Sequence, residues 1–345
     1  MNSSSKNRTI LVTGGAGYIG SHVVVQLAQQ GLEPVIIDNF SNSSSKVVSR
    51  LEEIVKRRIK LCEGDCRDFG FLEEVFHENK PDGVIHFAAF KSVEESVSNP
   101  LTYYENNVGG TINLLKAMSI HGCQQLVFSS SCTVYGNPDH LPVDENTPWM
   151  PAESPYGYTK QVCENIIRDQ TRGDQSISAV SLRYFNPIGA HPSGLIGELP
   201  IGVPSNLVPF ITQTAAGLRD ELIVFGNDYP TPDGSCIRDY IHVVDLAEAH
   251  IQSLAYLDQK KSSYDAFNIG TGKGASVLEL VTQFIESTGV NLPYRIGPRR
   301  RGDVVKIYAS VAKAEEVLQW KAKKSLKEAL VDAWNWQQSL SSNKI

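Results

Sequence analysis

The chain has 345 residues, and its 32 Lys and Arg residues against 38 Asp and Glu residues give a formal net charge of -6 at pH 7. This length is enough for a full α/β core with a second, smaller lobe. The acidic balance excludes a general electrostatic attraction to nucleic acid or to an anionic membrane, so a polyanionic ligand needs a local basic pocket.

The cysteines and the N-terminal residues both predict a cytoplasmic protein. The apolar stretch after the polar opening residues breaks at Gly14, which is too early for a signal-peptide core or a membrane span. The cysteines follow neither a disulfide framework nor a CxxC spacing, which predicts buried, reduced thiols in a reducing compartment. They are Cys62, Cys66, Cys123, Cys132, Cys163 and Cys236.

Short apolar runs alternate with helical patterns through the first part of the chain. The helical pattern of residues 21–30 stops at Gly31, between two apolar runs, and so predicts a βαβ unit. Alternation of this kind predicts an α/β fold with a doubly wound, parallel, Rossmann-type sheet. The predicted buried strands are residues 9–13, 34–37, 59–63, 83–87 and 125–129. Beyond Pro187 the Pro- and Gly-rich segments HPSGLIGELPIGVP and FGNDYPTPDG predict loops of a second lobe, where ligand contacts gather.

A glycine-rich loop follows the first predicted strand and leads into the first helix. Gly14, Gly17 and Gly20 leave room for backbone amides to approach a pyrophosphate at the positive end of that helix. Asp38 comes 18 residues after Gly20, at the end of the second strand, where its carboxylate accepts hydrogen bonds from the adenosine ribose hydroxyls. The same charge repels a 2'-phosphate, so the pattern predicts NAD rather than NADP. Asp65, at the end of the third strand, is placed to contact the adenine edge.

A second chemical signal combines Ser131 with Tyr156 and Lys160. Tyr156 and Lys160 are four residues apart and therefore share one helix face. An ammonium roughly 5 Å from a phenol, at an effective dielectric of about 20, contributes on the order of 3 kcal/mol, which lowers the phenol's pKa by roughly two units. Tyr156 is therefore predicted as the base for a substrate hydroxyl, with Ser131 hydrogen-bonded to the same oxygen.

Several segments resemble one enzyme family. Four segments are similar to those of extended short-chain dehydrogenase/reductases: TGGAGYIG, HFAA, SSSCTVYG and SPYGYTK. Later segments resemble one group within that family, the UDP-glucose (UDP-galactose) 4-epimerases. These segments are RYFNPIGAHPSG, the NLVP run, FGNDYPTPDG with IRDYIHVVDLA, and PRRRGDVV. The resemblance implies reversible C4 epimerisation of UDP-galactose and UDP-glucose. It implies an NAD-binding Rossmann domain of residues 1–186 plus 236–268 and a UDP-sugar-binding domain of residues 187–235 plus 269–345.

The same resemblance implies roles for individual residues. Tyr156 is the general base, Lys160 holds the nicotinamide ribose, Ser131 lies near the sugar hydroxyl and Thr133 assists. Residues expected to line the NAD, besides the loop glycines, are Tyr18, Ile19, Asp38, Asn39, Asn42, Ser43, Asp65, Cys66, Phe87, Ala88, Lys91, Asn106, Lys160 and Phe185. Residues expected to bind the UDP-sugar, besides Ser131 and Tyr156, are Asn186, Asn206, Leu207, Arg238, Arg300, Asp303 and Ile307. Fixed arginines suit a diphosphate in an acidic protein.

The implied mechanism passes hydride from C4 to the nicotinamide, turns the 4-keto sugar about its diphosphate link, and returns hydride to the opposite face. NAD is regenerated in each cycle, so the cofactor is expected to stay bound through purification. Ile307 stands where related epimerases carry a small residue or a tyrosine beside the C2 substituent. Substrate breadth is therefore open, and the alternative is a 4-epimerase of UDP-N-acetylhexosamine, a UDP-pentose or UDP-glucuronate.

Two alternative functions are weighed from the residues. A sugar-nucleotide 4,6-dehydratase needs an Asp-Glu pair after the Ser or Thr, where this chain has Cys132 and Thr133. A non-catalytic NAD sensor typically lacks the Tyr and Lys that this chain retains.

No metal site is expected, because His242, Asp245 and His250 lack a ligand pattern. The helical patterns of residues 101–121 and 156–170 carry mixed apolar faces, and analogy with the family predicts a homodimer through such helices.

Overall fold

The computed structural model describes residues 7–300 and 304–342, and the chain forms two compact units. The first unit comprises Met1–Val134, Ser154–Leu182 and Ala247–Ala266. The second comprises Tyr135–Glu153, Arg183–Leu246 and Phe267–Ile345. Residues 135–153, 183–186, 236–246 and 267–268 thus group with the second unit, although the sequence analysis placed them in the first domain. The assignment of the two ligands to separate domains stays a prediction.

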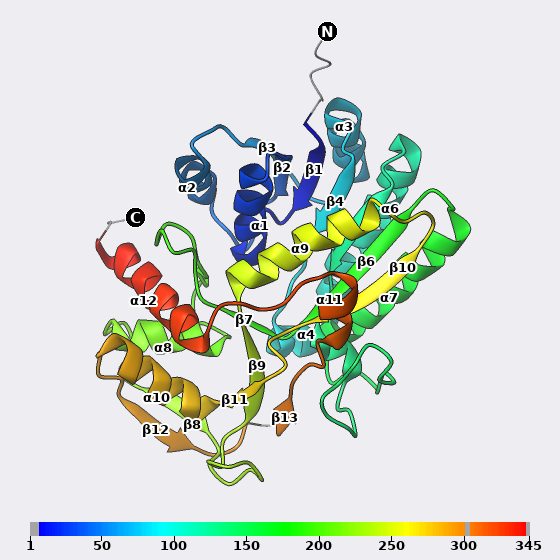
Figure 1. Ribbon diagram of the computed structural model, residues 1–345. Helices are drawn as coiled ribbons and strands as arrows, with labels where there is room; N and C mark the ends of the chain where they lie inside the picture. The colour runs from blue at the N-terminus through cyan, green and yellow to red at the C-terminus, as the bar shows by residue number, and fades with distance from the viewer. Residues whose placement is uncertain (1–6, 301–303, 343–345) are drawn as a thin grey trace. The chain divides into compact units, whose positions relative to one another are not determined.

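A seven-stranded sheet in the order β10-β6-β5-β4-β1-β2-β3 forms the centre of the first unit (Figure 1). Its strands are β1 (Thr9–Thr13), β2 (Glu33–Asp38), β3 (Lys60–Glu63), β4 (Gly83–His86), β5 (Gln125–Ser129), β6 (Ser178–Tyr184) and β10 (Tyr264–Ile269). The pairs β1–β2, β2–β3, β1–β4, β4–β5 and β5–β6 are parallel. The strand order reverses between β1 and β4, and ligands bind outside the carboxyl ends of strands at such a switch point. The predicted Rossmann-type sheet is confirmed.

Helices connect these strands in the expected alternating pattern. They are α1 (Tyr18–Gln29), α2 (Lys46–Val55), α3 (Phe69–Asn79), α4 (Val93–Ser98), α5 (Pro100–Tyr103), α6 (Gly110–His121), α7 (Pro155–Gly173) and α9 (Val243–Leu257). α1 begins three residues earlier than predicted, directly after Gly17, so Gly20 of the glycine-rich segment lies in its first turn. A π-helical turn, η1 (Tyr104–Gly109), interrupts the helix predicted over residues 101–121. Such turns often occur at functional sites.

The core of the first unit follows from the strand sequences. Leu11, Val84 and Leu126 lie on three adjacent strands and are fully buried. They form one apolar cluster with Phe76 of α3 and Leu114 of α6. Burying side chains of this size stabilises the fold by about 1.5–3 kcal/mol each. The packed sheet therefore provides a rigid base for the loops at its carboxyl edge.

The second unit contains two small sheets. In one, β9 (Ile237–His242) pairs with β7 (Asn186–Ile188), β11 (Gly274–Ser276) and β13 (Lys306–Ile307). In the other, β8 (Leu222–Phe225) pairs in parallel with β12 (Tyr294–Gly297). The helices are α8 (Leu207–Ala215), α10 (Val277–Thr288), α11 (Ala312–Val317) and α12 (Leu326–Ser342). Residues 191–204 and 226–234, within the two Pro- and Gly-rich segments, form turns and irregular loops, as predicted.

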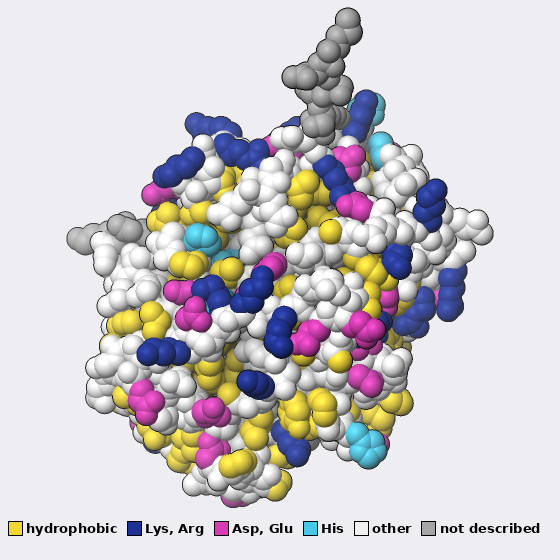
Figure 2. Space-filling model, in the orientation of Figure 1, with side chains coloured by type: hydrophobic (Ala, Val, Ile, Leu, Met, Phe, Trp, Pro, Cys, Tyr) yellow, Lys and Arg dark blue, Asp and Glu magenta, His cyan; other side chains and the backbone are white. Residues whose placement is uncertain are grey.

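Surface composition agrees with the weak net charge. On the face shown in Figure 2, side chains of both signs are interspersed rather than gathered by sign. Within residues 7–300 and 304–342, no helix combines the length and apolar character needed to cross a bilayer. The same part of the chain has no group of three or more His, Cys, Asp or Glu side chains arranged to hold a metal ion.

Candidate active site

The loop between β1 and α1 makes a close backbone approach that only glycine allows. Gly14 has a φ of +69°, and its amide donates a 2.7 Å hydrogen bond to the main-chain oxygen of Ile37. A Cβ at Gly20 would lie 2.2 Å from the main-chain oxygen of Gly14. Gly17 is the N-cap of α1, where free amides and the helix dipole favour an anion. This geometry fits the pyrophosphate of a dinucleotide.

Asp38 ends β2 and organises the loop that follows it. Its side chain is buried and accepts hydrogen bonds from the amide of Ala16 at 2.9 Å and the amide of Phe40 at 2.9 Å. The hydroxyl of Ser43 donates to the same carboxylate at 2.7 Å. Phe40 has a φ of 54°, a strained conformation for a non-glycine residue that Asp38 helps to hold. The carboxylate is thereby fixed at the edge of the sheet where a ribose is expected.

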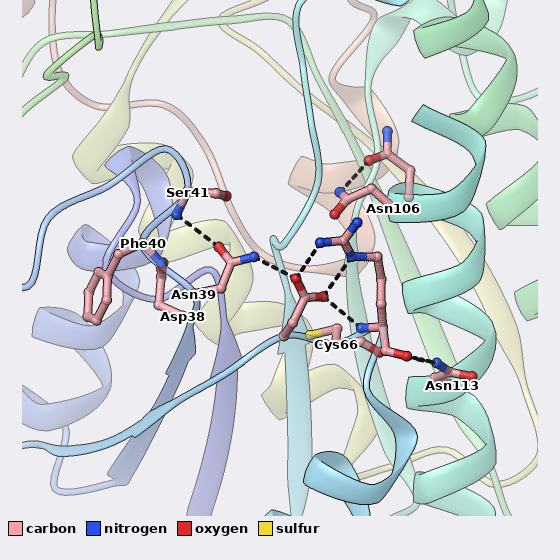
Figure 3. Close-up of polar contacts among 10 residues, drawn as sticks. Asp38, Asn39, Phe40, Ser41, Cys66, Asn106 and Asn113 are labelled. Atoms are coloured by element: carbon pink, nitrogen blue, oxygen red, sulfur yellow. Dashed lines mark hydrogen bonds and ion pairs between the residues drawn. The ribbon is translucent and has the colours of Figure 1, made fainter. Parts of the chain in front are cut away.

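Asp65 follows β3 and lies beside Asn39, whose side-chain amide donates to it at 2.8 Å (Figure 3). Arg67 also donates to Asp65, through Nε at 3.0 Å and through a terminal nitrogen at 2.8 Å. The hydrogen bond from Arg67 is the largest cause that lowers the pKa of Asp65 to about 2. Burial, assisted by the charges of Asp65 and Asp38, raises the pKa of the adjacent Cys66 thiol to about 12. At neutral pH Asp65 is therefore an ionised hydrogen-bond acceptor, and the Cys66 side chain is an uncharged thiol.

The π-helical turn η1 joins the loop after β4 to helix α7. Asn107 accepts a 2.8 Å hydrogen bond from the amide of Phe90 and donates to Thr159 of α7 at 3.1 Å. Asn106 donates to Asn107 at 3.0 Å, which brings this predicted cofactor residue to the same loop. Tyr18 and Ile19 begin α1, Asn42 follows β2, and Phe87, Ala88 and Lys91 follow β4. The first unit thus carries these side chains on loops, on the start of α1 and on η1, in the segments that follow its strands.

The catalytic candidates come from the start of α7 and the end of β5. Ser154 caps α7 by accepting a 3.1 Å hydrogen bond from the amide of Gly157, so the helix starts with Tyr156 in its first turn. Tyr156 and Lys160 are both buried, and Lys160 Nζ lies 6.0 Å from the centre of the Tyr156 ring. Lys160 Nζ also donates a 2.7 Å hydrogen bond to the main-chain oxygen of Ser129. Burial lowers the pKa of Lys160 to about 8.

Ser131 and Thr133 lie just beyond β5. Ser131 is buried, and its hydroxyl oxygen accepts a 3.2 Å hydrogen bond from the amide of Thr133. The side-chain Oγ1 of Thr133 is buried and has no hydrogen-bond partner within the described residues. A buried hydroxyl of this kind normally has a partner. The orphaned oxygen supports the expectation that Thr133 contacts a ligand.

The second unit holds the residues expected to bind the nucleotide diphosphate. Asn206 is the N-cap residue of α8 and donates a 2.6 Å hydrogen bond to Glu198. Arg238 on β9 is opposite Ile307 on β13 in the parallel register. Three further candidates are placed by the chain: Asn186 begins β7, Leu207 begins α8, and Arg300 is exposed. Phe185, predicted to line the cofactor, is buried in this second unit, and Asp303 lies outside the described residues.

Comparison with known proteins identifies the family. A family model described as GDP-mannose 4,6 dehydratase matches residues 11–333. UDP-glucose 4-epimerase 4 of Oryza sativa subsp. japonica is 51% identical over 333 residues, covering 96% of this chain and 90% of the rice protein. The chain belongs to the UDP-glucose 4-epimerase family of extended short-chain dehydrogenase/reductases.

Solved structures agree with this family assignment. The UDP-glucose-4-epimerase of Stenotrophomonas maltophila, solved with bound NAD and formylated UDP-arabinopyranose, superposes with a TM-score of 0.95 at 48% identity, covering 97% of this chain and 99% of that one. The epimerase of Bifidobacterium longum, in complex with NAD+ and UDP, gives a TM-score of 0.92 at 45% identity, covering 96% and 98%. The epimerase family fold therefore extends over both units.

The sequence analysis missed three side chains that hold these groups in place. Asn107 links η1 to α7, and its neighbour Asn106 was the only hint. Asp239 is fully buried next to Arg238 and accepts hydrogen bonds from the amides of Thr271 and Gly272 and from the Thr271 hydroxyl. Glu164 lies four residues after Lys160, a helical spacing that would have placed it on the catalytic face.

Proposed function

We propose that this chain catalyses the reversible C4 epimerisation of UDP-galactose and UDP-glucose through a 4-keto intermediate, with tightly bound NAD. The observation that carries the proposal is the position of Lys160 Nζ, which lies 6.0 Å from the centre of the Tyr156 ring and donates to the main-chain oxygen of Ser129, two residues before Ser131. This arrangement occurs in a chain that shares about half of its residues with a UDP-glucose 4-epimerase over nearly its full length. Bound NAD supplies a hydride acceptor that also returns the hydride.

The residues of the first unit fit that chemistry. Gly14 and Gly20 leave the backbone space for a pyrophosphate, and Asp38 is fixed where the ribose hydroxyls are expected. Tyr156 accepts the proton of the C4 hydroxyl and later returns it, while Lys160 supplies the nearby positive charge. Ser131 orients the reacting hydroxyl. Proton transfer by a positioned group of this kind contributes typically 10²–10⁴-fold to the rate.

The second unit is proposed to anchor the UDP. Arg238 and Arg300 provide bidentate cations for the diphosphate, and Asn186, Asn206 and Leu207 complete the set. Epimerisation requires firm contacts to the nucleotide and loose contacts to the sugar, because the ketone must present both faces to the hydride carrier. Ile307, beside Arg238 in the sheet register, is proposed to limit the space at the sugar.

A dehydratase reaction fits the residues less well, although the matching family model carries that description. Elimination requires an acid and a base next to the reacting serine. Cys132 and Thr133 occupy these positions, and neither side chain is the carboxylic acid that the dehydratase pair supplies. The residues therefore support epimerisation.

We further propose that the protein is a cytoplasmic homodimer. The outer faces of α6 and α7 share an apolar depression lined by Ile112, Leu115, Ile120 and Ile166, and Ile120 is 62% exposed. Exposed apolar surface of this kind marks an association site. The free thiols of all six cysteines suit a reducing compartment. Ile120→Glu should convert a dimer to a monomer in analytical ultracentrifugation, whereas a wild-type monomer would contradict the proposal.

The decisive experiment is to incubate the purified protein with UDP-galactose, without added cofactor, and to measure UDP-glucose. Formation of UDP-glucose is expected, and acid denaturation should release about one NAD per chain. Tyr156→Phe provides the inactive control. Absence of UDP-glucose even with added NAD would refute the proposed function, and release of NADH in proportion to turnover would refute the closed hydride cycle.

A further inference from the structure

Three consecutive serines at the end of β5 contact three different groups. The main-chain oxygen of Ser129 accepts from Lys160 Nζ at 2.7 Å. The hydroxyl of Ser130 donates to Glu164 Oε1 at 2.5 Å. The hydroxyl of Ser131 remains for the substrate and for the amide of Thr133. The segment that carries Ser131 is therefore held from α7 by two side chains of opposite charge.

Glu164 is completely buried, which is uncommon for a carboxylate without several partners. Besides Ser130, it accepts a 2.8 Å hydrogen bond from the hydroxyl of Tyr264 on β10. The same Tyr264 oxygen lies 3.0 Å from the hydroxyl of Ser181 on β6. Glu164 thus connects the catalytic helix to three neighbouring strands of the sheet, β5, β6 and β10.

The spacing along α7 places Glu164 with the catalytic residues. Tyr156, Lys160 and Glu164 are each four residues apart and therefore follow one helix face. Burial lowers the pKa of Lys160 most strongly, and the negative charges of Cys163, in its thiolate form, and of Glu164 raise it. The carboxylate therefore opposes the loss of the proton that burial favours at Lys160.

Two other titratable groups near this pair, His86 and Cys163, stay neutral near pH 7. His86 on β4 is buried, and desolvation followed by the charge of Lys160 lowers its pKa to about 3. Burial raises the pKa of the Cys163 thiol, which contacts Thr111 of α6. On β10, Tyr264 carries a phenol, and the guanidinium carbon of Arg168 lies 5.1 Å from the centre of its ring at the periphery of this network. Glu164 is the carboxylate that these contacts bring to Lys160.

We propose that Glu164 is a positioning residue for the reaction: its carboxylate keeps Lys160 protonated and, through Ser130, fixes the segment that presents Ser131. This inference rests on the proposed epimerase function. It separates two contributions, one from the charge of Glu164 and one from its hydrogen bond to Ser130. Each contribution has its own variant.

Glu164→Gln tests the charge, because the amide keeps the shape and can still hydrogen-bond to Ser130 and Tyr264. The alkaline limb of kcat should move to lower pH by about one unit, since a negative charge one helical turn from Lys160 stabilises the protonated ammonium by an amount of that order. Glu164→Asp keeps the charge and should leave that limb near its wild-type position. Asp169→Asn removes an exposed carboxylate from the same helix and is the matched control, with an unchanged profile expected.

Ser130→Ala tests the hydrogen bond and removes no charge, so it remains informative if Glu164→Gln does not fold. A fall in kcat of about tenfold with an unmoved alkaline limb and little change in KM is expected. An alkaline limb that coincides in wild type and folded Glu164→Gln would overturn the charge role. Wild-type kcat in Ser130→Ala would overturn the orienting role. A wild-type protein that forms no UDP-glucose would instead refute the proposed function, so the two failures are distinguishable.

Discussion

The ammonium group of Lys160 donates to the main-chain oxygen of Ser129 at 2.7 Å while it lies 6.0 Å from the centre of the Tyr156 ring. The hydrogen bond fixes the cation on the side of α7 that faces the end of β5. Burial lowers the pKa of this lysine to about 8, so its charge is retained at neutral pH but is lost not far above it. The pair therefore sets both the geometry and the working pH range of the proposed base.

The first prediction concerns the alkaline pH range. Lys160 is protonated below its pKa of about 8 and neutral above it, so the positive charge beside Tyr156 disappears as the pH rises through 8. The rate of UDP-galactose epimerisation should fall in the same range. Steady-state kcat measured from pH 6 to pH 10 tests this, with protein integrity checked by circular dichroism at each pH. A rate that stays constant to pH 10 would show that the charge of Lys160 is not required.

The second prediction compares two tyrosines on α7. Tyr156 is buried beside Lys160, whereas Tyr158 is 49% exposed and contacts the ring of Tyr104. Tyr156→Phe should lower kcat by at least 10²-fold, because it removes the proton acceptor and leaves the ring. Tyr158→Phe should retain activity within about twofold. Equal losses in the two variants would contradict the assignment of the base.

The third prediction concerns the dinucleotide loop. Gly20→Ala places a Cβ against the main-chain oxygen of Gly14, a clash that side-chain rotation cannot relieve. The variant should lose its bound NAD, and its free energy of unfolding should drop by about 1–3 kcal/mol. Gly173→Ala, also on a helix, meets no atom within 4 Å and serves as the control. NAD content after acid denaturation and urea unfolding measure the two effects, and normal NAD content in Gly20→Ala would refute the close-approach argument.

The fold could be predicted because its signals are local. The strand predicted over residues 125–129 coincides with β5, since a short apolar run between turns needs no information from elsewhere in the chain. The glycine loop could be predicted for the same reason, because the close backbone approach between Gly14 and Gly20 is local in the sequence. The π-helical turn of Tyr104–Gly109 was missed, because its residues look like an ordinary helix, and the hydrogen bond of its Asn107 to Thr159 of α7 joins residues distant in the sequence.

The residues that support the candidate site were harder to predict, because their partners are distant in the sequence. Glu164 receives a hydrogen bond from Tyr264, and Tyr264 lies on β10, a strand that the sequence analysis did not identify. Asp239 is similar, because its partners Thr271 and Ala309 come from separate segments. Helical spacing alone places Glu164 beside Lys160, but it cannot show that the carboxylate is buried.

The fourth prediction tests Asp239. Its carboxylate accepts hydrogen bonds from the amides of Thr271, Gly272 and Ala309. In each of these contacts a main-chain N–H donates to a carboxylate oxygen of Asp239. Asp239→Asn turns one acceptor into a donor and should lower the free energy of unfolding by about 2 kcal/mol. KM for UDP-galactose should also rise, because Arg238 is its direct neighbour on β9. Urea unfolding and steady-state kinetics measure these effects, and an unchanged midpoint would show that the contacts contribute little.

The last prediction concerns substrate breadth. Ile307 is 7% exposed and sits opposite Arg238 in the pairing of β13 with β9, so its side chain is held by the sheet rather than by a mobile loop. Its branched side chain should leave room for the C2 hydroxyl of UDP-galactose but not for the acetamido group of UDP-N-acetylgalactosamine. The wild type should therefore turn over the first substrate well and the second poorly.

Ile307→Ser should raise kcat/KM for the N-acetylated substrate by on the order of tenfold or more, because removing methyl groups from a pocket wall changes discrimination by that amount. Ile296→Ser makes the same chemical change at an exposed position of β12 and should alter neither value. Comparable kcat/KM for the two substrates in the wild type would show that Ile307 does not restrict the site.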